Sequence, residues 1–325
     1  KIKPGLPVIY CQHGLLDSSD SWIMNDEALA PGLILANAGY DVWIGNIRGN
    51  RYSLGHTIYN SSDFRSPYWD FSWQEMSIYD LPAAFIYINN ITGQQINYIG
   101  HSQGTCIMFA ALARRDPVIL KYLKHYIALG PVAYVDHTTS PIIHLIDVTD
   151  IGGIILVTHG KKFLFLSQTE KTELELLCTT ALSVCIEQIK LFADVHPEVD
   201  NTKKLNIFVG HFPAGTSTQN MEYWDQMSKD KEYRMFDYGK AGNLKHYNQT
   251  TPPLIPLSNI NVPVHIFAGV YDDLADPRDV ARLMSELTGS PNVTYHAYNY
   301  GHLTFLIGLE VNYLKDVLAI LKGSP

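Results

Sequence analysis

The segment from Gln94 to Arg114 constrains the fold of this chain most strongly. It contains a β-branched and aromatic run, then Gly100-His101-Ser102-Gln103-Gly104, then an apolar, alanine-rich stretch. This order predicts a strand, a sharp turn and a helix, with Ser102 held at positive φ on the turn. Gly100 and Gly104 are required there because a Cβ at either position would collide where strand and helix cross. A serine that merely caps a helix would also suit the motif, but the flanking strand and helix favour a nucleophile.

Strand-like and helix-like segments alternate on both sides of this turn, apart from one long interruption. The apolar runs with strand character cover residues 8–12, 41–45, 96–99, 126–129, 262–269 and 293–298. The segments with helical spacing cover residues 29–38, 75–89, 105–114 and 303–321, and Pro82 is expected to break the second of them. Uninterrupted apolar strands suit a parallel sheet that is covered on both faces. The alternation therefore predicts an α/β protein with a mostly parallel, doubly wound sheet.

The interruption runs from about residue 132 to residue 260, where no strand alternation is found. We expect a discontinuous core over residues 1–132 and 259–325, with residues 133–258 inserted as a mainly helical cap or lid. Apolar residues from Leu174 to Phe192 recur at helical spacing and predict one helix. Its apolar side suits either the core of the insertion or the underside of a lid that meets a lipid-like substrate, and the two are compatible.

Composition excludes several classes of function. The net charge of −8 and the absence of a Lys/Arg cluster argue against a nucleic-acid partner. No apolar run is long enough to cross a membrane. No zinc, EF-hand or phosphate-loop motif is present, so neither a metal nor a cofactor is expected. The chain opens on Lys1-Ile2-Lys3-Pro4 directly before a strand, so we expect further N-terminal strands and any targeting signal to precede it.

The cysteines and the glycosylation sequons bear on the cellular compartment. Cys11 and Cys106 are expected to be buried thiols. Cys178 and Cys185 lie seven residues apart, and one continuous helix would hold them too far apart for a disulfide. Asn-x-Ser/Thr sequons favour a secretory route and lie at Asn60, Asn90, Asn248 and Asn292.

A nucleophilic Ser102 needs an acid and a histidine, which follow it in that order in a sheet of this kind. Three aspartates follow the strand that ends at Ala268. Asp276 precedes Pro277 and suits a helix cap. Asp272 lies on the first turn after the strand and is the preferred acid, with Asp273 as the alternative.

Of thirteen histidines, His302 alone follows the last strand and precedes the last helix, so it is the expected general base. An oxyanion hole needs two amides, and we assign these to Gln103 and Leu15. His13 is expected to shape the loop that carries Leu15. In the predicted mechanism, Ser102 attacks an ester carbonyl, His302 transfers the proton, and water frees the acid from an acyl-enzyme.

Six sequence blocks carry a resemblance to the acid lipase family, typified by gastric and lysosomal acid lipases. They are His13–Leu16, Gly39–Asn46 with Arg48–Asn50, Tyr79–Ala83, Gly100–Thr105, Pro213–Ser217 with Gln219–Met221, and Leu274–Pro277. The resemblance implies an α/β-hydrolase with a cap and lid that hydrolyses triacylglycerols or cholesteryl esters, commonly at acidic pH, in a secreted or lysosomal setting. It also implies the triad Ser102, Asp272 and His302, with Leu15 and Gln103 as oxyanion donors. Of the two cysteines that digestive members pair in the cap, this chain matches only Cys178.

The leading hypothesis is therefore a lipid-ester hydrolase that acts at a lipid–water interface. A catalytically silent lipid carrier would keep the same fold and cap without the chemistry. A small-ester or peptide hydrolase would use the same triad on another substrate, because fold and substrate choice are separable.

Overall fold

The core of the protein is a six-stranded sheet in the order β2-β1-β3-β4-β8-β9. The computed structural model describes residues 5–143, 158–191 and 193–323. All neighbouring strands of this sheet are parallel, which confirms the predicted α/β architecture. In sheet order the strands are β2 (Asp41–Ile44), β1 (Val8–Gln12), β3 (Ile96–His101), β4 (Leu123–Leu129), β8 (Val264–Gly269) and β9 (Val293–Tyr298).

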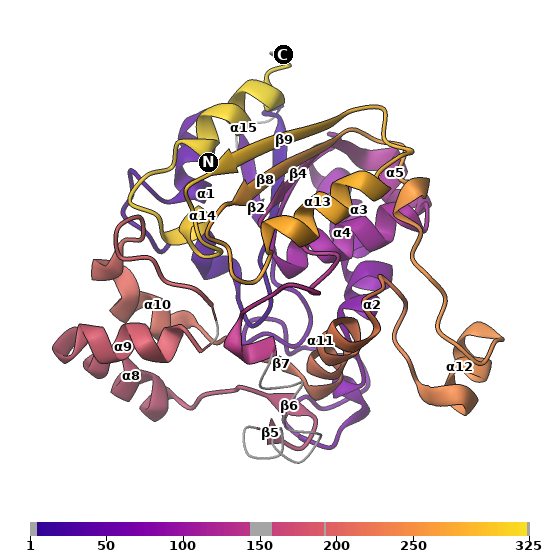
Figure 1. The fold of residues 1–325 in the computed structure, drawn as a ribbon, viewed down its shortest axis with the longest axis horizontal. Helices are drawn as coiled ribbons and strands as arrows, with labels where there is room; N and C mark the ends of the chain where they lie inside the picture. The colour runs from indigo at the N-terminus through magenta and orange to yellow at the C-terminus, as the bar shows by residue number, and fades with distance from the viewer. Residues whose placement is uncertain (1–4, 144–157, 192, 324–325) are drawn as a thin grey trace.

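Burial explains the apolar character of the strands. Every residue of β1, β3 and β8 is buried, whereas every residue of the edge strand β9 is at least partly exposed. Helices cover both faces of the sheet: α1 (Pro31–Asn37) and α15 (Tyr313–Leu321) lie on one side, and α3 (Leu81–Thr92), α4 (Gln103–Ala113), α5 (Pro117–Tyr122) and α13 (Pro277–Glu286) on the other (Figure 1).

Two predicted helices differ from the structure. Pro82 does not break the helix expected over residues 75–89, because it stands in the first turn of α3, where its missing N–H costs nothing. A short helix, α2 (Trp73–Glu75), and a π-helical turn, η3 (Met76–Asp80), lead into α3. The helix expected over residues 303–321 is split into α14 (Thr304–Ile307) and α15, since Gly308 adopts an extended conformation between them.

Residues 133–258, which we call the cap segment, connect β4 to β8. Its helices lie below the sheet in the view of Figure 1. It also contains a small antiparallel sheet of two-residue strands, which the sequence analysis did not predict. The elements are β5 (Thr158–His159), β6 (Lys162–Phe163), α8 (Gln168–Thr180), α9 (Leu182–Ile189), α10 (Leu205–His211), β7 (Thr216–Ser217), α11 (Thr218–Asp230) and α12 (Gly239–Tyr247).

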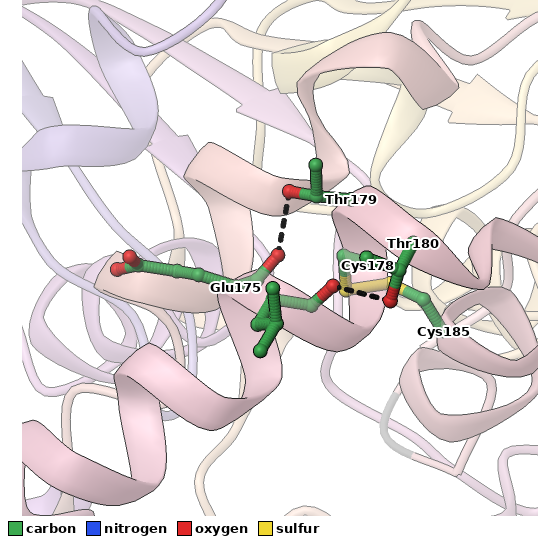
Figure 2. Close-up of a disulfide and its surroundings, with 6 residues drawn as sticks. Glu175, Cys178, Thr179, Thr180 and Cys185 are labelled. Atoms are coloured by element: carbon green, nitrogen blue, oxygen red, sulfur yellow. Dashed lines mark hydrogen bonds between the residues drawn. A yellow bond between two sulfur atoms is a disulfide. The ribbon is translucent and has the colours of Figure 1, made fainter.

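The prediction of one continuous helix through Cys178 and Cys185 is wrong. Ala181 leaves the helical region (φ −141°, ψ 63°), so α8 ends there and α9 turns back against it. The two cysteines consequently lie 4.8 Å apart at their Cα atoms and form a disulfide (Figure 2). The hydroxyls of Thr179 and Thr180 donate to carbonyls four residues earlier (Figure 2), a bond that competes with regular helix geometry. Phe192, at the end of the predicted helix, lies outside the described residues.

Cys11 and Cys106 are buried and unpaired, as predicted. Within the described residues, no helix combines the length and the apolar character needed to cross a bilayer.

Candidate active site

Four loops meet at the carboxyl-terminal edge of the sheet, because the parallel strands that precede them all end there. Ser102 follows β3, the Gly14–Leu16 loop follows β1, Asp272 follows β8 and His302 follows β9. Residues from all four loops line one cavity of about 30 Å³, among them Leu15, Ser102, Leu274 and His302. Such a volume has room for water and none for an acyl ester.

The turn at Ser102 has the strained geometry expected of it. Ser102 has φ 54° and ψ −122° and stands directly before α4. A Cβ on Gly100 would lie 2.7 Å from the carbonyl oxygen of Gly104, and one on Gly104 would lie 2.5 Å from that of Gln12. Only glycine fits at either position, and the backbone amide of Gln103 begins α4, where negative charge is favoured.

The imidazole of His302 is fixed by Asp272. Its Nδ1 atom lies 2.9 Å and 3.0 Å from the two carboxylate oxygens, and both side chains are buried. Asp272 also accepts hydrogen bonds from the amides of Leu274 and Ala275, at 3.0 Å and 2.6 Å. With Nδ1 engaged, Nε2 of His302 is buried without a hydrogen-bond partner among the described residues. That atom can act as the proton acceptor for a group in the cavity.

The other two aspartates considered from the sequence have different surroundings. Asp276 caps α13 by accepting from the amide of Arg278 at 2.8 Å, as predicted. The side chain of Asp273 is exposed. Only Asp272 of the three makes a hydrogen bond to the His302 ring in the described structure.

The loop expected to supply the second oxyanion amide packs directly on Ser102. A Cβ on Gly14 would lie 2.8 Å from that of Ser102, so glycine is needed for the close approach. His13 shapes this loop as predicted: its Nδ1 donates to the carbonyl of Gly14 at 2.8 Å while Nε2 accepts from the amide of Ile47 at 3.2 Å. Burial lowers the pKa of His13 to about 4, so the ring is neutral at physiological pH.

Carboxyl groups dominate the electrostatics around His302. Burial by itself lowers the pKa of His302, but Asp272, Asp194 and Asp17 together raise that pKa above its ordinary value. Burial raises the pKa of the Asp17 carboxyl, which lines the cavity, to about 7. The neighbouring His101 donates to the carbonyl of His302 at 2.9 Å, and burial lowers its pKa to about 3. His101 is therefore a neutral structural partner.

Several contacts around the site were not found from the sequence. Asp194, from the cap segment, accepts hydrogen bonds from the amides of Asp273 and His302. The side chain of Gln103 is held by Asn220 and Trp224 of α11, at 2.9 Å and 3.0 Å. Asn220 stood in a block that the family resemblance singled out, but no motif or spacing pointed to Asp194.

Comparison with known proteins identifies the family to which this chain is similar. A family model described as "alpha/beta hydrolase fold" matches residues 7–309. The mouse gastric triacylglycerol lipase is 38% identical over 318 residues, covering 94% of this chain and 77% of that protein. The human lysosomal acid lipase/cholesteryl ester hydrolase is 39% identical over 311 residues, covering 94% and 76% respectively. The chain belongs to the acid lipase family.

These relatives are named as lipases, which are carboxylic ester hydrolases. This chain is an enzyme of the same class. Family membership and fold support hydrolysis of lipid esters. Solved structures with lower sequence identity share the fold alone. One is a hydrolase from Oleispira antarctica, 13% identical with a TM-score of 0.52, covering 99% of this chain and 92% of that one.

Proposed function

We propose that this acid lipase family member hydrolyses carboxylic esters of neutral lipids, triacylglycerols or cholesteryl esters, with Ser102, His302 and Asp272 as a catalytic triad. The observation that supports it best is the state of His302. Its Nδ1 is paired with Asp272, and its Nε2 is buried and unpaired among the described residues, in a ring that shares a cavity with Ser102.

The proposed reaction uses these groups in two half-reactions. The Nε2 atom of His302 accepts the Ser102 proton as Oγ attacks the ester carbonyl, and the imidazolium is stabilised by Asp272. The amides of Leu15 and Gln103 donate to the oxyanion. His302 then gives its proton to the leaving alcohol, which leaves an acyl group on Ser102. Water, deprotonated by His302, attacks that acyl group and releases the fatty acid.

A second, apolar cavity supports a lipid ester as substrate. It has a volume of about 180 Å³, and α8 and α9 contribute most of its lining residues. Phe212 lines both this cavity and the one at Ser102. In the proposed complex, the cavity at Ser102 widens to admit the ester carbonyl, and the acyl chain passes Phe212 into the second cavity. Each methylene buried there among leucines would contribute about 0.8 kcal/mol. A small-ester hydrolase would have no use for this second cavity.

We also propose a secretory route, to the outside of the cell or to the lysosome. The Cys178–Cys185 disulfide supports it, because disulfides persist in oxidising compartments. All four sequon asparagines, Asn60, Asn90, Asn248 and Asn292, are exposed and accessible to glycosylation.

The test compares the unaltered protein with Ser102→Ala on an emulsified long-chain glyceride, a cholesteryl ester and a soluble short ester. The exposed Ser285→Ala is the matched control. We expect Ser102→Ala to lose activity by several orders of magnitude and Ser285→Ala to retain it. An organophosphonate should label the unaltered protein and Ser285→Ala, but not Ser102→Ala. Equal turnover by Ser102→Ala removes the mechanism, and lipid binding without labelling or turnover favours the carrier hypothesis.

A further inference from the structure

We propose that Asp194 is a positioning residue for the proposed triad, a carboxylate from the cap segment that holds the loops of Asp272 and His302 at a fixed separation. The inference rests on the proposed function, because it assigns a role to a residue that does not itself line the cavity at Ser102 and acts through His302, which does. Asp194 is buried and accepts two hydrogen bonds.

The two oxygens of Asp194 bind two different loops. Oδ1 accepts from the backbone amide of His302 at 2.7 Å, and Oδ2 accepts from the backbone amide of Asp273 at 2.8 Å. The two amides belong to the proposed base and to the residue directly after the proposed acid. A carboxylate is rigid and planar, so it fixes the distance between the two donors. The side chain therefore ties together the loops after β8 and β9 independently of the His302–Asp272 contact.

The surroundings leave Asp194 little freedom to move. The residue is 7% exposed. A Cβ on Gly301 would lie 2.4 Å from its Oδ1 atom, so glycine before His302 leaves the space that the carboxylate occupies. A buried carboxyl is costly unless its oxygens accept hydrogen bonds, and the two amides meet that requirement.

The rest of the same segment is attached to the His302 loop as well. Asp200 accepts from the hydroxyl of Thr304 at 2.6 Å, and that hydroxyl accepts from the amide of Gly301 at 3.0 Å. The backbone of Asn201 donates to Ile307, and Leu309 donates to Val199, both at 2.7 Å. Asp194 thus lies at the end of a continuous attachment between cap segment and catalytic loop, at the point closest to the imidazole.

An amide at position 194 separates the positioning role from simple space filling. Asn keeps the shape of Asp, but it has one oxygen and one NH₂ group, so it can accept from only one of the two backbone donors. The NH₂ group would face the other N–H, and one loop would be released. Ala would release both. Neither change alters a group that contacts the substrate.

The experiment uses the full chain and the variants Asp194→Asn and Asp194→Ala, with Glu198→Gln as the control. Glu198 is an exposed carboxylate of the same segment. Activity on a soluble short ester is expressed per site titrated with an organophosphonate, so that unfolded molecules do not count. A misplacement near 1 Å can cost about 10²-fold, so we expect kcat to fall between about 10- and 100-fold in Asp194→Asn and at least as far in Asp194→Ala. KM should stay within about threefold, and Glu198→Gln should match the unaltered protein.

The pH profile supplies a readout that a merely structural role would not move. Burial and the neighbouring Asp272 raise the pKa of Asp194 to about 7, so near and above that pH its negative charge is one of the factors that raise the pKa of His302. Removal of this charge should shift the acid limb of kcat/KM to lower pH. Partial unfolding alone would reduce the number of active sites that the organophosphonate labels, and it would leave the acid limb of kcat/KM at the same pH. An Asp194→Asn variant with unchanged kcat per site and an unshifted limb overturns the proposal.

Hydrogen exchange of the unaltered protein keeps the inference testable if both variants fail to fold. We expect the amides of Asp273 and His302 to show similar, high protection factors. If one of the two amides is protected and the other exchanges freely, the proposal that Asp194 holds both loops is overturned. If the unaltered protein neither hydrolyses esters nor takes the phosphonate label, the proposed function fails. If the unaltered protein is active and Asp194→Asn has the same activity, only the role of Asp194 fails.

Discussion

The Nδ1 atom of His302 lies 2.9 Å from the Oδ2 atom of Asp272, with both side chains buried. This contact orients the ring and leaves Nε2 as the nitrogen that the proposed mechanism uses. An Asp272→Asn variant would place an amide against the ring and favour the wrong tautomer. We expect kcat on a soluble ester to fall by about 10³- to 10⁴-fold. Asp273→Asn, one residue along the chain and exposed, should keep kcat within about twofold; the reverse order of effects would make Asp273 the acid.

The apolar cavity behind Phe212 predicts how the enzyme responds to acyl-chain length. Leu177 lines this cavity, whereas the adjacent Leu176 is exposed on the other side of α8. Leu177→Trp should lower kcat/KM for a palmitoyl ester by about tenfold, equivalent to two methylenes left unburied, with little change for a butyryl ester. Leu176→Trp is the matched control. Equal loss on both esters would mean that the cavity takes no part in acyl binding.

The buried Asp17 predicts a stability difference that depends on pH. Burial raises the pKa of its carboxyl to about 7 in the folded protein, above the value near 3.9 of an unfolded chain. The stabilising contribution of the protonated form is therefore fully present below that unfolded value and is lost as pH rises through 7. The Asp17→Asn variant does not lose it, so relative to the unaltered protein it should gain on the order of 2 kcal/mol in unfolding free energy between pH 5 and pH 8.

Urea unfolding at the two pH values measures this difference. Glu27→Gln, an exposed carboxylate of the same region, should show none. A difference for Asp17→Asn that is constant with pH would mean that Asp17 is ionised throughout.

The disulfide between α8 and α9 predicts sensitivity to reductant. It closes a loop with a sequence separation of 7 residues, and loop-closure entropy for that length is about 2 kcal/mol. We expect the Cys178→Ser/Cys185→Ser double variant to be less stable by about this amount in urea. Dithiothreitol should destabilise the unaltered protein and leave the double variant unchanged. A double variant that still responds to reductant would contradict the pairing.

Local sequence was sufficient to predict the six strands of the main sheet and the turn at Ser102. Runs of buried β-branched and aromatic residues have few alternatives to a central parallel strand, and Gly100 and Gly104 are each surrounded by backbone that excludes a Cβ. The proximity of His302 and Asp272 followed from topology, since the loops after parallel strands share one edge. Their roles in catalysis stay predictions, as do those of Leu15 and Gln103.

The cap segment was predicted less well because its structure depends on distant contacts. Ala181 separates α8 from α9, yet alanine is the best helix former, so no local signal marked the break between the two cysteines. The contact of Asp194 with His302 spans 108 residues along the chain, and nothing in a stretch without motif or strand indicates where such a carboxylate will be buried.

The backbone amide of Ala214, in the cap segment, donates to the carbonyl of Leu16 at 2.6 Å. From the same segment, Asp194 accepts from the amide of His302 and Asn220 donates to the side chain of Gln103. The cap segment is consequently attached to the loops that carry the proposed catalytic residues. A chimaera that exchanged residues 133–258 for the corresponding region of another lipase would replace these three hydrogen-bonding residues together with the residues that line the proposed acyl cavity. Substrate selectivity could be transferred between two enzymes only where both form the same hydrogen bonds between this segment and the loops of the sheet.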